Sequence, residues 1–92
     1  MQIIDEKITK DMPKLYTQDG LNKESIVYLI LEGLNGWKWY ITEFDGLDTF
    51  FGFVKGDYPE WGYINKTELN KLISNNFIYI VSTEQRQLKE YI

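Results

Sequence analysis

Carboxylate side chains gather in one stretch of the sequence, between Glu43 and Glu60. Glu43 and Asp45 stand two residues apart at the end of a predicted strand, so we expect them to share one face. With Asp48 and Glu60 they are the candidates for acid–base chemistry or for holding Mg²⁺ or Ca²⁺. However, residues 43–48 do not match a calcium-binding loop. No metal or cofactor is therefore expected.

The sequence lacks the residue types on which most other enzyme classes depend. It contains no histidine and no cysteine, which removes the commonest general base, the usual nucleophilic triads, disulfides and thiolate metal sites. The nearest approach to a phosphate-binding loop, Gly52–Gly56, lacks the required spacing and lies in a predicted strand. We expect Gly52 and Gly56 to permit close packing or a bulge. These residues predict a protein that is not an enzyme.

The net charge of −4 is concentrated in the same stretch of chain. Residues 43–60 hold five acids and one lysine, whereas the remaining residues hold nine acids and nine bases. The acids are either solvated turn residues or a patch that attracts a basic partner. The ten Lys and Arg residues are scattered, so direct binding to nucleic acid is not expected.

Aromatic residues make up 16% of the chain, and most fall on predicted strands, where they fit a core. Tyr58 and Trp61 differ because they flank a turn beside acidic residues. Exposed Tyr and Trp are common anchors at protein interfaces. We therefore predict a partner-binding surface made of Asp45, Asp48, Asp57, Tyr58, Glu60 and Trp61.

Hydrophobic patterning predicts the α+β class, with an antiparallel sheet of four to five strands. The expected meander has strands at residues 25–32, 37–44, 49–55 and 61–64, followed by a helix and a last strand at 77–81. In the second strand, strict alternation places Ile41 on one face, and Tyr40 and Phe44 together on the other.

Two helices are predicted. The first is Asp5–Met12, which Pro13 ends. The second follows Asn65, with Asn65 and Glu68 as a capping box. Its buried stripe consists of Leu69, Leu72 and Ile73. Residues 84–91 fit either a terminal helix or a tail.

The length of 92 residues fits a single domain, 1–92, and no apolar run is long enough to cross a membrane. The start, Met1–Glu6, has neither the basic nor the apolar region of a signal peptide. Small secreted domains usually carry disulfides, so the absence of cysteine favours a reducing compartment. We expect a cytoplasmic protein.

Several blocks of the sequence, taken together and in order, resemble a known family. These blocks are Leu15-Tyr16, Asp19-Gly20, Trp39–Asp45, Phe50–Gly56, Pro59–Tyr63 and Glu68-Leu69. The combination resembles domain-of-unknown-function family 2958, whose members are short bacterial, plasmid and phage proteins. Trp61 departs from the family pattern, which has a smaller aliphatic residue there.

The resemblance implies a non-enzymatic anti-CRISPR protein that inhibits Cas9-type nucleases in the bacterial cytoplasm. Such an inhibitor would place an acidic, aromatic surface on a basic region of the nuclease or its guide complex. Two alternatives stay open. One is a housekeeping or plasmid-maintenance adaptor that binds another host protein; the other is a metal-dependent enzyme that uses Glu43, Asp45 and Glu60.

Overall fold

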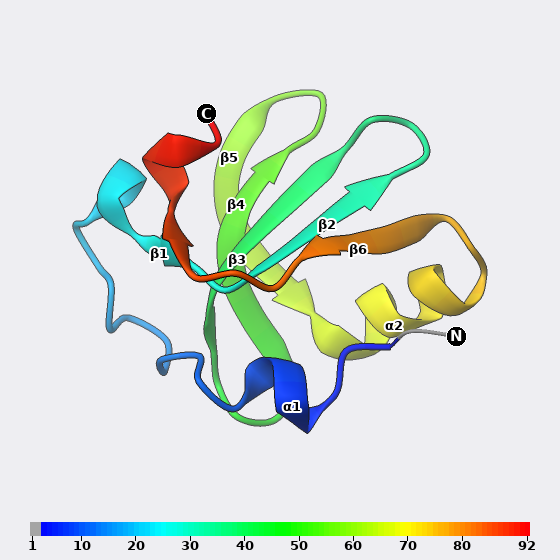
Figure 1. Cartoon of the computed structure of the whole chain (residues 1–92), viewed down its shortest axis with the longest axis horizontal. Coiled ribbons are helices and arrows are strands. Elements are labelled where there is room, and N and C mark those ends of the chain that lie inside the picture. Colours follow the sequence, from blue (N-terminus) through cyan, green and yellow to red (C-terminus); the bar gives the residue numbers. More distant parts are fainter. Residues whose placement is uncertain (1–2) are drawn as a thin grey trace.

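The computed structural model describes residues 3–92, which are organised around a five-stranded antiparallel sheet (Figure 1). The expected meander consists of β2 (Leu29–Gly33), β3 (Lys38–Phe44), β4 (Thr49–Lys55) and β5 (Pro59–Asn65). Helix α2 (Lys66–Ser74) follows, and β6 (Ile78–Ser82) returns antiparallel to β2. The order across the sheet is β5-β4-β3-β2-β6, so β5 and β6 are its edges. The predicted α+β class is confirmed.

Shorter elements lie at the two ends of the chain. The N-terminal part holds α1 (Glu6–Thr9), the 3-10 turn η1 (Asn22–Glu24) and β1 (Ile26–Val27); the C-terminal part holds β7 (Arg86–Gln87) and the 3-10 turn η2 (Leu88–Glu90). Strand β1 pairs antiparallel with β7, so residues 26–27 lie beside residues 86–87 near the C-terminal end (Figure 1). Residues 84–91 thus form a strand and one turn of 3-10 helix. Of the stretch Met1–Glu6, which the sequence analysis distinguished from a signal peptide, Met1 and Gln2 lie outside the described residues.

Two predicted elements differ in length from those observed. Helix α1 ends at Thr9 rather than Met12. Beyond it, the Pro13 carbonyl accepts a hydrogen bond from the Phe44 N–H at the end of β3 (3.0 Å), which ties this segment to the sheet. The predicted strand 25–32 is interrupted at Tyr28, whose N–H donates to the Ile41 carbonyl (2.9 Å). This break lets β1 turn away from the sheet and pair with β7.

Both faces of the sheet carry buried side chains. On one face, which we call the helix face, α2 contributes Leu69 and Ile73 to a cluster that includes Phe50, with Leu72 partly buried beside it, so the predicted stripe is confirmed. On the opposite face, the open face, Tyr40 packs with Leu88 of the C-terminal segment. That segment covers the β2–β3 part of the open face and leaves much of β4 and β5 less covered.

Helix α2 does not begin with the predicted capping box, because the Asn65 side chain caps no helical N–H. Asp48, from the β3–β4 turn, caps the start of the helix in place of Asn65. Its Oδ1 accepts hydrogen bonds from the Thr67 N–H (2.9 Å) and hydroxyl (2.6 Å), and its carbonyl accepts one from Lys66 N–H (2.7 Å). A carboxylate there satisfies otherwise unpaired donors at the positive end of the helix.

Candidate functional site

A β-bulge at Thr42 sets the direction of the neighbouring acidic side chain. The register between β3 and β4 shifts between Ile41 and Glu43, and the Thr42 hydroxyl donates to the Phe51 carbonyl (3.1 Å). The extra residue reverses the alternation, so Glu43 follows Tyr40 to the open face and Phe44 joins Ile41 on the helix face. The prediction that Tyr40 and Phe44 share a face is therefore wrong.

Glu43 is buried, with 2% of its surface exposed, and holds a loop in place. One carboxylate oxygen accepts a hydrogen bond from the Tyr16 N–H (2.8 Å) and the other accepts one from the Gln18 N–H (2.6 Å). Asp45, in contrast, is exposed beyond the end of β3. The two carboxylates therefore do not act together, because Glu43 is occupied by the backbone amides of the loop and Asp45 by those of the turn.

The loop that Glu43 holds also uses the Gln18 side chain as a bridge. Its amide nitrogen donates to the carbonyls of Ile26 and Thr42 (both 3.0 Å), and its amide oxygen accepts from Ile26 N–H (2.6 Å). Tyr16 adopts a positive φ of 73°, a conformation that costs a non-glycine residue about 1–3 kcal/mol. The hydrogen bonds of Glu43 and Gln18 offset this strain and fix the loop against the open face.

Asp45 and Asp48, two of the predicted contact residues, make hydrogen bonds within the chain. Asp45 Oδ1 accepts from the N–H groups of Leu47 (2.8 Å), Asp48 (3.0 Å) and Thr49 (3.0 Å), which closes the β3–β4 turn. The bond from Leu47 is the main reason that the Asp45 pKa lies below its usual value. The pKa of Asp48 is also below its usual value, mainly because its carboxylate accepts the hydrogen bond of the Thr67 hydroxyl. Both carboxylates therefore have a structural task.

Asp57, Tyr58 and Glu60 lie at the β4–β5 hairpin, where residues 56–58 form the loop between the paired Lys55 and Pro59. Tyr58 is 79% exposed. Within residues 3–92, neither Asp57 nor Glu60 makes a side-chain hydrogen bond or ion pair. Lys38 is the cross-strand partner of Lys55, so the acidic tip borders two lysines. The acidic surface is consequently smaller than the sequence predicts.

Trp61 belongs to a row of aromatic side chains on the open face of β4 and β5. Its ring stacks on Phe51 (centroids 5.6 Å apart, planes at 10°) and meets Phe53 edge-on (5.3 Å). Tyr63 continues the row beside Phe51 (5.2 Å), and its hydroxyl donates to that of Tyr16 (3.2 Å). This bond raises the pKa of Tyr63. Glu60, the neighbour of Trp61 on a strand, points to the opposite face.

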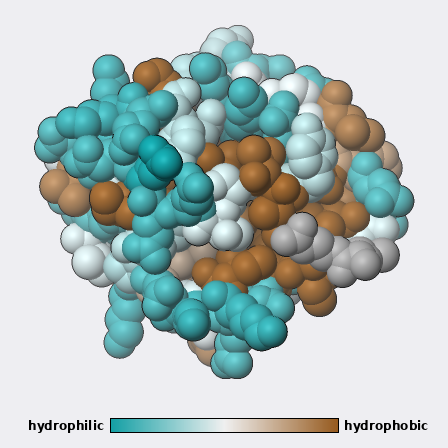
Figure 2. Space-filling model, in the orientation of Figure 1, coloured by the Kyte–Doolittle hydropathy of each residue, from teal (hydrophilic) through white to brown (hydrophobic). Residues whose placement is uncertain are grey.

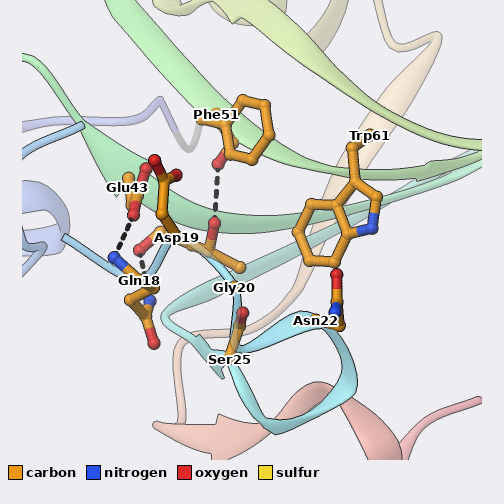
Figure 3. A pocket seen from close by; sticks show the side chains of 9 residues that line it. Gln18, Asp19, Gly20, Asn22, Ser25, Glu43, Phe51 and Trp61 are labelled. Atoms are coloured by element: carbon orange, nitrogen blue, oxygen red, sulfur yellow. Dashed lines mark hydrogen bonds between the residues drawn. The ribbon is translucent and has the colours of Figure 1, made fainter. Parts of the chain in front are cut away.

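A pocket of about 250 Å³ opens between this aromatic row and the loop that Glu43 holds (Figure 3). Trp61 and Phe51 form one wall. The other lining residues come from the loop and from β3: Gln18, Asp19, Gly20, Asn22, Ser25, Thr42 and Glu43. Of the predicted contact residues only Trp61 lies here. Asp19-Gly20 entered the sequence analysis only as a block of the family resemblance, and the other loop residues of the pocket carried no motif.

A second hollow, of about 380 Å³, lies between the β2–β3 hairpin and the end of α2 and is lined mainly by apolar groups. Leu34 (74% exposed) and Phe77 (58% exposed) are among its lining residues. Figure 2 shows hydrophobic residues gathering from this hairpin across β2 and β6, whereas the side with the 10–25 loop is mainly hydrophilic. Sequence analysis assigned none of these residues to a site.

The carboxylates proposed for metal chemistry do not come together. Among residues 3–92, no group of three acidic side chains is placed to hold a metal ion. Glu43 is engaged with two backbone amides, while Glu60 lies at the hairpin. In the same described part of the chain, no helix is long and apolar enough to traverse a bilayer.

Comparison with known proteins finds no family model, no curated protein and no solved structure that matches the chain. The resemblance to family 2958 therefore stays a prediction, and the function has to be argued from the chain itself.

Proposed function

We propose that this protein is a non-enzymatic binding protein whose partner docks on the open face of β4 and β5 and on the tip of their hairpin. The observation that carries this proposal is the row of aromatic rings formed by Phe51, Phe53, Trp61 and Tyr63. Three of these side chains are half-buried and Tyr63 is 58% exposed. Aromatic groups left open to solvent in one contiguous row are typical of interface anchors.

The hairpin tip supplies the polar rim of the proposed interface. Tyr58 is the most exposed aromatic residue there, Asp57 precedes it, and Glu60 lies at the hairpin on the opposite side of β5 from Trp61. Neither carboxylate has a side-chain partner among residues 3–92. Free carboxylates at a rim contribute more to the association rate and to partner choice than to affinity. A partner with a basic surface is therefore favoured.

The partner class to test first is the one that the sequence resemblance implies, a Cas9-type nuclease with its guide RNA. The chain would act as a stoichiometric inhibitor, and no part of the proposal requires catalysis. The assay adds purified protein to the loaded nuclease and measures cleavage of target DNA, with binding followed by calorimetry. We expect inhibition that saturates near a fixed molar ratio.

Charge reversal at the tip tests the surface. The double variant Asp57→Lys with Glu60→Lys should bind more weakly and with a smaller dependence on salt concentration. The matched control is Asp11→Lys with Glu68→Lys, which changes the net charge equally at exposed acids outside the hairpin. Equal binding by both double variants would refute the role of the tip. If the protein binds the nuclease but leaves cleavage unchanged, the inhibitor proposal fails and an adaptor role is favoured.

A further inference from the structure

We infer that the pocket beside Trp61 receives one arginine side chain of the partner. This inference deepens the proposed function and rests on it, because the pocket adjoins the aromatic row that carries the proposed interface. The pocket has the size for a single side chain. Its volume of about 250 Å³ is below the range of about 300–1,000 Å³ typical of sites for drug-sized ligands.

The charge of the pocket favours a cation. Asp19 and Glu43 line it, and none of its lining residues is Lys or Arg. Glu43 is fixed by the two backbone amides it binds, so its charge stays at the inner wall. Asp19 stands on the loop at the rim, and among residues 3–92 its side chain has no hydrogen-bond partner. Two carboxylates without a neighbouring base create a negative potential inside a concave wall.

The aromatic wall favours the same kind of ligand by a second, independent interaction. The rings of Phe51 and Trp61 lie nearly parallel, with planes at 10°. A cation over the face of Trp is attracted by the ring quadrupole. The guanidinium of arginine is planar and stacks on aromatic faces, whereas the ammonium of lysine is compact and more strongly hydrated. An aromatic wall therefore suits arginine better.

An unused hydrogen-bonding group at the base of the pocket completes the match. The Ser25 hydroxyl lines the pocket and has no hydrogen-bond partner within residues 3–92. It is open to the pocket, because the Tyr91 hydroxyl is the one fully buried side-chain group left unpaired in that part of the chain. Figure 3 shows this side chain pointing toward the pocket below Gly20, with the Asn22 side chain next to the Trp61 ring. A guanidinium with five N–H donors can satisfy the Ser25 oxygen, the Asn22 carbonyl and the Asp19 carboxylate.

The experiment measures ligand binding to the pocket by NMR, with the protein alone and no partner present. The probe is N-acetyl-arginine amide, titrated into ¹⁵N-labelled protein, with the amide signals of Asn22 and Ser25 and the indole N–H of Trp61 as reporters. We expect these three signals to shift together, with weak saturable binding. The citrulline analogue, which has the same shape without the charge, should leave them unshifted, and the lysine analogue should bind more weakly.

Two variants locate the effect. Asp19→Asn should weaken probe binding about two- to fivefold, the range for a partly solvated charge pair. Trp61→Leu should weaken it about fivefold or more, read from the Asn22 and Ser25 signals after circular dichroism has established that the variant folds. The control Asp11→Asn changes an exposed acid outside the pocket and should bind like the parent protein.

The inference is overturned if citrulline shifts the signals as arginine does, if lysine binds as tightly as arginine, or if Asp19→Asn has no more effect than Asp11→Asn. None of these results involves the partner, so failure of the pocket is distinguishable from failure of the proposed interface. The latter is decided by charge reversal at Asp57 and Glu60.

Discussion

Substitution of Glu43 tests directly whether a buried carboxylate holds the loop that borders the pocket. The side chain is 2% exposed and accepts hydrogen bonds from the N–H groups of Tyr16 and Gln18. Glu43→Ala removes both acceptors and leaves two donors facing an apolar methyl. Glu43→Gln keeps one oxygen acceptor but brings its NH₂ group against the other backbone donor.

The cost follows from these two bonds. A hydrogen bond to a charged group contributes about 1.5–3 kcal/mol to stability. Removal of the buried charge offsets part of this lost free energy, because the cost of desolvating the carboxylate disappears as well. We therefore expect Glu43→Ala to lower the free energy of unfolding by about 3–5 kcal/mol and Glu43→Gln by about half as much. The total free energy of unfolding of a domain is only about 5–15 kcal/mol.

The assay is urea unfolding followed by Trp fluorescence and by far-UV circular dichroism. The midpoint for Glu43→Ala should fall by about 2–5 M, because the dependence of stability on urea for a domain of this size is at the low end of about 1–3 kcal/mol/M. The matched control is Glu60→Ala, an exposed glutamate whose loss should change the free energy of unfolding by less than about 0.5 kcal/mol. In the Gln variant, which keeps more stability, the amide signals of Tyr16 and Gln18 should move most. If the free energies of unfolding of Glu43→Ala and Glu60→Ala differ by less than about 1 kcal/mol, Glu43 does not anchor the loop.

Three further predictions concern the turns and the sheet. Asp48→Asn should lower the midpoint of thermal unfolding more than Asp11→Asn, since only Asp48 caps α2. The pKa values of Asp45 and Asp48 are lowered in the folded state, so their stabilisation is present at neutral pH and is lost as the pH falls through the folded values. Urea titrations should show stability decreasing below about pH 4, and the Asp45→Asn, Asp48→Asn double variant should show a flatter profile. Gly52→Ala places a methyl against the Tyr40 carbonyl and should cost about 1–3 kcal/mol in urea unfolding; parent-like stability would contradict that contact.

The parts of the fold that local patterns determine were predictable from the sequence. Turn residues and alternating apolar residues located the strands of the meander, and the stripe of α2 was recognised from its spacing. The role proposed for Gly52 is also confirmed, because a side chain there would collide with the Tyr40 carbonyl. Each of these inferences depends only on the types and spacing of residues that are close together in the sequence.

The parts that failed depend on distant residues or on one inserted position. Nothing local to Asn65 reveals that a carboxylate 17 residues earlier takes over the capping of α2. The bulge at Thr42 adds a single residue to one strand, which moves Glu43 to the other face and buries it. Acidic residues that looked alike in sequence therefore have three different roles: loop anchor, turn and cap, and exposed tip.

The capping of α2 by Asp48 makes the stability of this helix depend on a distant part of the chain. The donors at the start of the helix find their acceptor in a turn between two strands, not in the residue that precedes the helix. A nine-residue helix is too short to persist alone in water. The stability of the helix therefore depends on the β3–β4 turn, and a peptide covering residues 65–75 should remain a coil in isolation.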